Sequence, residues 1–138
     1  MAAGLWLVAA TALHLGFQLT VSVLVYPALA DLTPEQWVIA HGRHSRRIVP
    51  LVVLTYAAAL LTLAAAFRAG PATGWLVASA AGTALALVAT ASGAAPLHGR
   101  LGAGHDTALV GRLLWVDRLR TAGALLAAAS AMGWALSR

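Results

Sequence analysis

Long apolar segments alternate with short polar stretches along the chain. Four segments are long enough to cross a bilayer, whose core of about 30 Å requires roughly 20 apolar residues per helix. They cover about residues 4–29, 49–67, 74–94 and 113–136. Backbone groups in lipid must be hydrogen-bonded within a helix or a closed barrel, and runs such as 57–67 lack the two-residue alternation of barrel strands. The pattern therefore predicts an all-α, integral-membrane, antiparallel four-helix bundle.

The connections between these spans are short, so residues 1–138 form a single transmembrane domain. The first connection begins with Thr33-Pro34-Glu35-Gln36, which has the pattern of a capping box with proline at the first helical position. We expect a short extra helix in this first cytoplasmic loop. Pro50 permits a bend where the second span begins, and Pro96 ends the third span.

The composition excludes several classes of protein. Hydrophobic residues make up 61% of the chain and charged residues 9%, which is far too little charge for a soluble domain of this size. The absence of cysteine excludes disulfides, thiolate ligands and cysteine nucleophiles. The net charge of +5 comes from arginine alone, and no separate basic domain exists to bind nucleic acid. The lipid bilayer is the expected partner of these arginines.

The arginines also predict an orientation. Seven of the nine fall on the side of the bundle that holds the first and third connections. By the positive-inside rule that side is cytoplasmic and both termini lie outside. We therefore expect a multi-pass protein of the inner (plasma) membrane, with its polar cluster on the cytoplasmic side.

Ionisable residues concentrate in two stretches, 31–47 and 98–120, which four spans place at the same end. His41, His44 and His98 are predicted to converge there as metal ligands, with Asp117 as a fourth ligand or a base. Imidazole without thiolate suits copper or iron. The alternative for each histidine is an interfacial position, bonded to water and lipid headgroups.

Asp117 and Arg120 share one face at the start of the fourth span. With His98 they are the candidate catalytic residues: Asp117 as base, and Arg120 to bind an oxyanion or orient Asp117. The alternative is an ion pair that joins helices. Tyr26, Arg47 and Trp115 lie near the same interface and are candidates for substrate binding.

His14 and Gln18 share an inward face of the first span with Ser22. We assign His14 and Gln18 to cofactor binding, with an axial haem position as the less favoured cofactor hypothesis. An interhelical hydrogen bond is the alternative.

Small residues spaced by four form ridges on two spans. The third span carries Ala78, Gly82 and Ala86, and the fourth carries Gly123, and then Ala127 and Ala131. Such ridges let helices approach closely. They serve either the interior of the bundle or a homo-oligomer.

Several short motifs follow one another in a recognisable order. They are Val25-Tyr26-Pro27, His41-x-x-His44-x-Arg46-Arg47-Ile48, Pro96-Leu97-His98, Arg112-Leu113-Leu114 and Arg120-Thr121. In this order the chain resembles a group of small four-span bacterial membrane proteins, which are more distantly similar to the anthrone-oxygenase-like family. That family is linked to oxidation of aromatic polyketides in secondary metabolism. In its pattern asparagines stand where this chain has His98 and Asp117, a departure that makes the site more metal-like.

These observations lead to four functional hypotheses. The first is a membrane enzyme that takes a lipophilic small molecule from the bilayer and oxidises or oxidatively cyclises it with the help of a metal. The second is a metal-free cyclase or isomerase in which Asp117 and a histidine exchange protons. The third is a haem- or quinone-binding electron carrier that uses His14, and the fourth is a non-catalytic membrane subunit.

Overall fold

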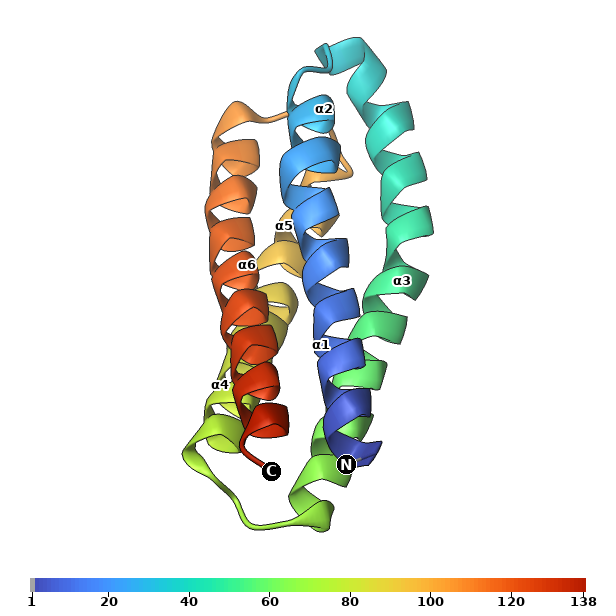
Figure 1. Ribbon diagram of the computed structural model, residues 1–138. Coiled ribbons are helices and arrows are strands. Elements are labelled where there is room, and N and C mark those ends of the chain that lie inside the picture. Colours follow the sequence, from blue (N-terminus) through green and yellow to red (C-terminus); the bar gives the residue numbers. More distant parts are fainter. Residues whose placement is uncertain (1) are drawn as a thin grey trace.

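The computed structural model describes residues 2–138 as four helical rods, and these residues contain no strand (Figure 1). The rods are α1 (Ala2–Thr20), η1 (Val21–Val25) and α2 (Tyr26–Ala30); α3 (Pro34–Ala69); α4 (Gly74–Val88), η2 (Ala89–Ala94) and α5 (Ala95–Leu101); and α6 (Thr107–Leu136). Each rod is long and apolar enough to cross a membrane. The predicted all-α bundle of four membrane helices is confirmed, and the chain has the architecture of a multi-pass membrane protein.

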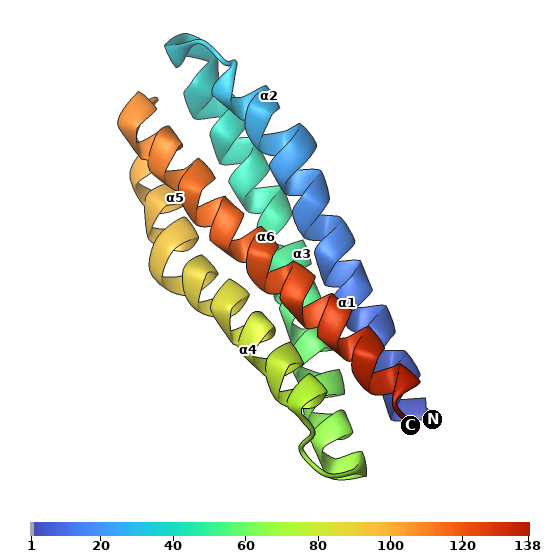
Figure 2. The ribbon, with the colours of Figure 1, turned by 60° about the vertical axis from the view of Figure 1, so that its left-hand side comes forward.

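The rods pack as a four-helix bundle in which α6 contacts both α4 and α1 (Figure 2). The remaining rod, α3, packs mainly against α1 and makes a smaller contact with α4. Both marked chain ends lie at one end of the bundle, which we call the terminal end (Figure 1). The opposite end holds α2, the first turns of α3, α5 and the start of α6, and we call it the histidine end. This arrangement brings the two polar stretches of the sequence together.

The predicted short helix of the first connection is continuous with the second span. The capping box is present at Thr33, whose N–H donates to Gln36 Oε1 at 3.3 Å, and α3 then runs unbroken through Pro50. Pro50 has no N–H, so the backbone hydrogen bond to the carbonyl of Arg46, four residues before it, is missing. This carbonyl lies in the polar part of α3. With 36 residues, α3 is about 54 Å long, nearly twice the hydrocarbon thickness of a bilayer, about 30 Å.

Two π-helical turns interrupt the first and third rods just before a proline. The N–H of Tyr26 bonds to the carbonyl of Val21, and the N–H of Ala95 to that of Thr90. A π turn widens the helix by one residue, which relieves the clash between a proline ring and the preceding turn. The third rod therefore continues beyond Pro96, where the sequence predicted its end, and α5 brings His98 into the bundle.

The ridges of small residues pack against each other within the chain. A Cβ added at Gly82 would lie 2.6 Å from the Gly123 carbonyl oxygen, and one added at Gly123 would lie 2.7 Å from the Gly82 carbonyl oxygen. Ser79 Oγ also donates to the Ala127 carbonyl at 3.0 Å. The two ridges therefore contact each other inside the bundle. They do not support the predicted homo-oligomer.

Apolar side chains fill the bundle near the terminal end. Leu7, Leu63, Leu76, Ala131 and Trp134 form one buried cluster there. Burial of such side chains excludes water. The polar interior described below therefore has a hydrophobic seal on one side.

We expect Gly82→Ala to destabilise the protein by about 1–3 kcal/mol, because the new methyl group meets backbone atoms that no side-chain rotation can move. Gly111→Ala on α6 is the matched control, since its Cβ meets no heavy atom within 4 Å among the described residues. Unfolding in detergent, followed by circular dichroism, measures the difference. Equal stability of the two variants would contradict the close α4–α6 packing.

Candidate functional site

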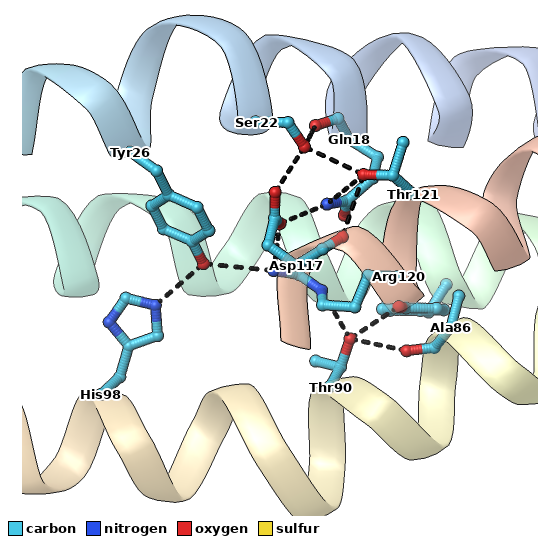
Figure 3. A network of polar contacts seen from close by, with 10 residues as sticks. Gln18, Ser22, Tyr26, Ala86, Thr90, His98, Asp117, Arg120 and Thr121 are labelled. Carbon is cyan, nitrogen blue, oxygen red and sulfur yellow. Dashed lines mark hydrogen bonds and ion pairs between the residues drawn. The ribbon is translucent and has the colours of Figure 1, made fainter. Parts of the chain in front are cut away.

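A buried ion pair joins Asp117 and Arg120 in the middle of α6. The two side chains are 5% and 4% exposed, and Arg120 Nη1 lies 3.3 Å from Asp117 Oδ1. The carboxylate also accepts hydrogen bonds from Gln18 Nε2 and Ser22 Oγ, each at 2.5 Å (Figure 3). A carboxylate bonded in this way is stabilised as an anion, because each donor replaces part of its lost hydration.

The Arg120 guanidinium connects α6 to the other rods. Its Nε donates to Thr90 Oγ1 of η2 at 3.0 Å, and its Nη1 donates to the Tyr26 hydroxyl of α2 at 3.2 Å (Figure 3). Thr90 Oγ1 also lies 2.7 Å from the Tyr56 hydroxyl of α3. All four rods therefore contribute to the network around one positive charge.

A second chain of hydrogen bonds leads from Tyr26 toward the histidine end. The Tyr26 hydroxyl lies 3.1 Å from His98 Nε2, and His98 Nδ1 lies 3.0 Å from His41 Nε2. Trp37 stacks on the His41 ring with centroids 5.0 Å apart and donates from Nε1 to the Leu101 carbonyl. We call Tyr26, His98 and His41 the relay.

Tyr26 accepts a hydrogen bond from Arg120, because arginine can only donate. The direction of the other two bonds depends on the tautomers of His98 and His41, and we assign the arrangement in which Tyr26 donates to His98 Nε2. His98 then carries its hydrogen on Nδ1 and donates to His41 Nε2, which leaves the His41 hydrogen on Nδ1. Within the described residues, His41 Nδ1 is buried without a hydrogen-bond partner. In the assigned arrangement each hydrogen bond of the relay is donated toward His41.

A pocket of about 280 Å³ opens beside Tyr26, between α3 and the third rod. Tyr26, His98 and Arg120 supply polar atoms to it, and Val49 and Val52 are among its aliphatic walls. We call it the relay pocket. A few convergent polar groups in an apolar hollow are typical of a small-molecule site.

The three predicted metal ligands do come together. His98 pairs with His41, and its ring centroid lies 5.7 Å from that of His44. Both nitrogens of His98 are, however, engaged by Tyr26 and His41, so ligation would require these bonds to break. No group of three or more residues suited to hold a metal ion occurs in residues 2–138. The geometry fits a hydrogen-bonded relay better than a copper or iron centre, and the metal stays a prediction.

Asp117 and Arg120 occupy different positions relative to the relay pocket. Arg120 lines it, whereas Asp117 reaches it only through Arg120, and the oxyanion role of Arg120 stays a prediction. Asp117 is therefore placed to hold and neutralise Arg120.

His14 and Gln18 lie in the bundle interior. Gln18 donates a hydrogen bond to Asp117 of α6. This is the hydrogen bond between helices that the sequence offered as the alternative to cofactor binding. His14 is 1% exposed, and its ring centroid lies 4.6 Å from that of Tyr56. Neither ring nitrogen has a hydrogen-bond partner in the described part of the chain, and haem binding at His14 stays a prediction.

The predicted substrate-binding residues separate in space. Tyr26 lines the relay pocket, whereas Arg47 lines a different groove between η1 and α3. Trp115 is 59% exposed and borders a shallow hollow beside Arg112.

Sequence reasoning missed Thr90 and Tyr56. Thr90 stands among alanines, and threonine in membrane helices commonly bonds to its own backbone, as Thr90 does to the Ala86 carbonyl. Tyr56 offered a clearer signal, because a phenol within an apolar span needs a hydrogen-bond partner.

The chain matches no family model, no curated protein and no solved structure. The resemblance to the anthrone-oxygenase-like family stays a prediction. The class of protein therefore rests on the fold and the site: a multi-pass helical membrane bundle with a buried ion pair and a hydrogen-bonded relay.

We expect Arg120→Met to destabilise the protein by about 3–5 kcal/mol, because it leaves the Asp117 carboxylate buried without its counter-ion. The double variant Asp117→Asn, Arg120→Met should lose less than the sum of the single losses. A double-mutant cycle measured by unfolding in detergent checks this, with exposed Arg118→Ala as control. Additive losses would contradict the pairing.

We expect nitrogen NMR of histidine-labelled protein at mildly alkaline pH to show His98 and His41 both with hydrogen on Nδ1. Tyr26→Phe keeps the ring but removes the donor, so the His98 Nε2 signal should move while that of half-buried His105, which is not part of the relay, stays. An unchanged His98 spectrum would exclude the assigned direction.

Proposed function

We propose that this protein is a membrane-embedded acid–base enzyme that isomerises or cyclises a lipophilic molecule carrying a carbonyl group. This is the metal-free hypothesis, with the proton-transfer role moved from Asp117 to Tyr26 and His98. The observation that carries it is the relay, which begins at the wall of an apolar pocket and leads away from it.

Substrate binding in the relay pocket would use two kinds of contact. The aliphatic walls accept the apolar body of the molecule, and Arg120 faces its oxygen. A guanidinium in a water-poor pocket stabilises negative charge on oxygen far more than it would in water. Because Asp117 balances Arg120, the resting site needs no additional anion.

The relay supports a balanced proton-transfer step. Tyr26 oxygen takes a proton from the carbon next to the carbonyl, while its own hydroxyl proton passes to His98 Nε2. His98 releases its Nδ1 proton to His41 Nε2. The products are an enolate facing Arg120 and a protonated His41. Return of the proton to a different carbon completes an isomerisation.

Trp37 supports the charged form of His41. Its indole ring stacks on the imidazole with an interplanar angle of 14°. An aromatic face within about 6 Å of a cation stabilises it.

Cyclisation uses the same groups. The enolate carbon attacks a second carbonyl of the same molecule, and the resulting alkoxide receives the proton that returns through Tyr26. No oxidant or reductant is needed in either reaction. General acid–base catalysis therefore suffices.

The seal at the terminal end favours an enzyme over a channel. The cluster around Leu7 and Trp134 closes the bundle beyond His14, so the polar network reaches only one end. We propose that this end is the cytoplasmic one, because it carries most of the arginines.

Hydrogen exchange into a lipophilic ketone tests the proposal. Purified protein in deuterated water with tetralone, or with related ketones of one to three fused rings, should speed deuterium uptake next to the carbonyl, measured by mass spectrometry. Tyr26→Phe should lower the catalysed rate about 100-fold or more, because the relay loses its first group.

Arg118→Ala, an exposed change on the same helix as Arg120, should keep the full rate. Catalysed exchange that survives in both Tyr26→Phe and His98→Ala would show that other residues transfer the proton. Failure of the wild type to exceed Tyr26→Phe with every ketone would reject the proposed reaction class.

A further inference from the structure

A larger hollow of about 880 Å³ lies between the first rod and α3. Phe17, Val21 and Val25 form one apolar wall, and Ile39, Ile48 and Leu51 lie along the other. We call it the η1–α3 groove. It does not include Tyr26, His98 or Arg120, so it is separate from the relay pocket.

Two arginines mark one region of this groove. Arg43 and Arg47 line it one helical turn apart on α3, whereas exposed Arg46 on the same helix does not. Glu35 also lines the groove, about 12 Å from Arg43 along the helix axis. The positive charge therefore lies between Glu35 and the apolar end at Leu51.

His44 adds a buried polar atom to the same region. It lines the groove between the two arginines in sequence, and its Nε2 is buried with no partner among the residues described. A buried polar atom that lacks a hydrogen bond is costly. A ligand oxygen in the groove would reach this nitrogen only if the His44 ring turned, so the charge of the two arginines carries the argument for an anion.

We propose that the η1–α3 groove binds an anionic phospholipid of the surrounding leaflet. The phosphate lies at Arg43 and Arg47, and an acyl chain follows the apolar walls toward Phe17 and Leu51. Basic hollows between membrane helices recognise anionic headgroups, and arginine binds phosphate through paired donors.

Three features favour a lipid over a free anion. The groove lies between two rods that are apolar enough to cross a membrane. Its walls are mostly apolar, and its volume falls in the range of small-molecule sites. A free phosphate would contact the arginines and leave these walls unused. The positions of the charged and apolar residues therefore place the lipid headgroup at the arginines and its acyl chain toward Leu51.

Native mass spectrometry of the whole protein from nanodiscs of mixed phosphatidylglycerol and phosphatidylcholine tests the proposal. The wild type should retain phosphatidylglycerol preferentially. Arg43→Ala and Arg47→Ala should each lower this preference about fivefold, while Arg46→Ala leaves it unchanged. An equal loss in all three variants, or no preference in the wild type, would overturn the site.

A second pair of variants tests the apolar walls. Leu51→Trp should fill the apolar end of the groove and reduce lipid retention, whereas Leu54→Trp, on the same helix but outside the groove lining, should not. Excess inorganic phosphate should not displace the lipid. Displacement by phosphate, or equal retention in Leu51→Trp and Leu54→Trp, would refute binding along the groove.

The inference goes beyond the proposed enzyme, and the two fail independently. Tyr26→Phe should keep full lipid preference because Tyr26 does not line the groove. Loss of lipid preference in Tyr26→Phe would show that the groove and the relay pocket are one site, and would overturn the groove as a separate lipid site.

Discussion

The positive charge of Arg120, buried inside an apolar bundle, is the constraint on which the rest of the polar interior depends. An isolated ion of this kind costs far too much to bury unless it is paired and hydrogen-bonded. Asp117 supplies the counter-charge from one turn away, and Thr90 and Tyr26 each accept a further hydrogen bond from the guanidinium. Each partner comes from a different rod, so satisfying one guanidinium specifies how the first, third and fourth rods are positioned relative to one another.

The two π-helical turns make this arrangement compatible with proline. Pro27 and Pro96 each follow such a turn, and the helix continues on the far side of each. Tyr26 and His98 lie within three residues of these prolines. The widened turns therefore lie where the relay meets Arg120, in agreement with the frequent occurrence of π turns at functional sites.

The two halves of the bundle differ in how closely their helices pack. Toward the terminal end, small residues let α4 and α6 approach until their backbones touch, and apolar side chains fill the remainder. Toward the histidine end α3 lies less closely against its neighbours, and both the relay pocket and the η1–α3 groove line it. Tight packing in one half thus contrasts with the other half, where both hollows open beside α3.

The sequence by itself determined the class of fold and the end at which polar chemistry gathers. Runs of about 20 apolar residues predicted the membrane helices, and the capping box at Thr33 marked the start of α3. The small-residue ridges predicted close helix packing, but not whether it occurs inside the bundle or between copies of the chain. The convergence of His41 and His98 also followed from the order of the spans. What the spacing of residues could not decide is which atoms face one another across different helices, because rotation and register depend on packing.

Only the tertiary structure therefore showed that both His98 nitrogens are used, that Asp117 lies behind Arg120, and that Thr90 completes the network.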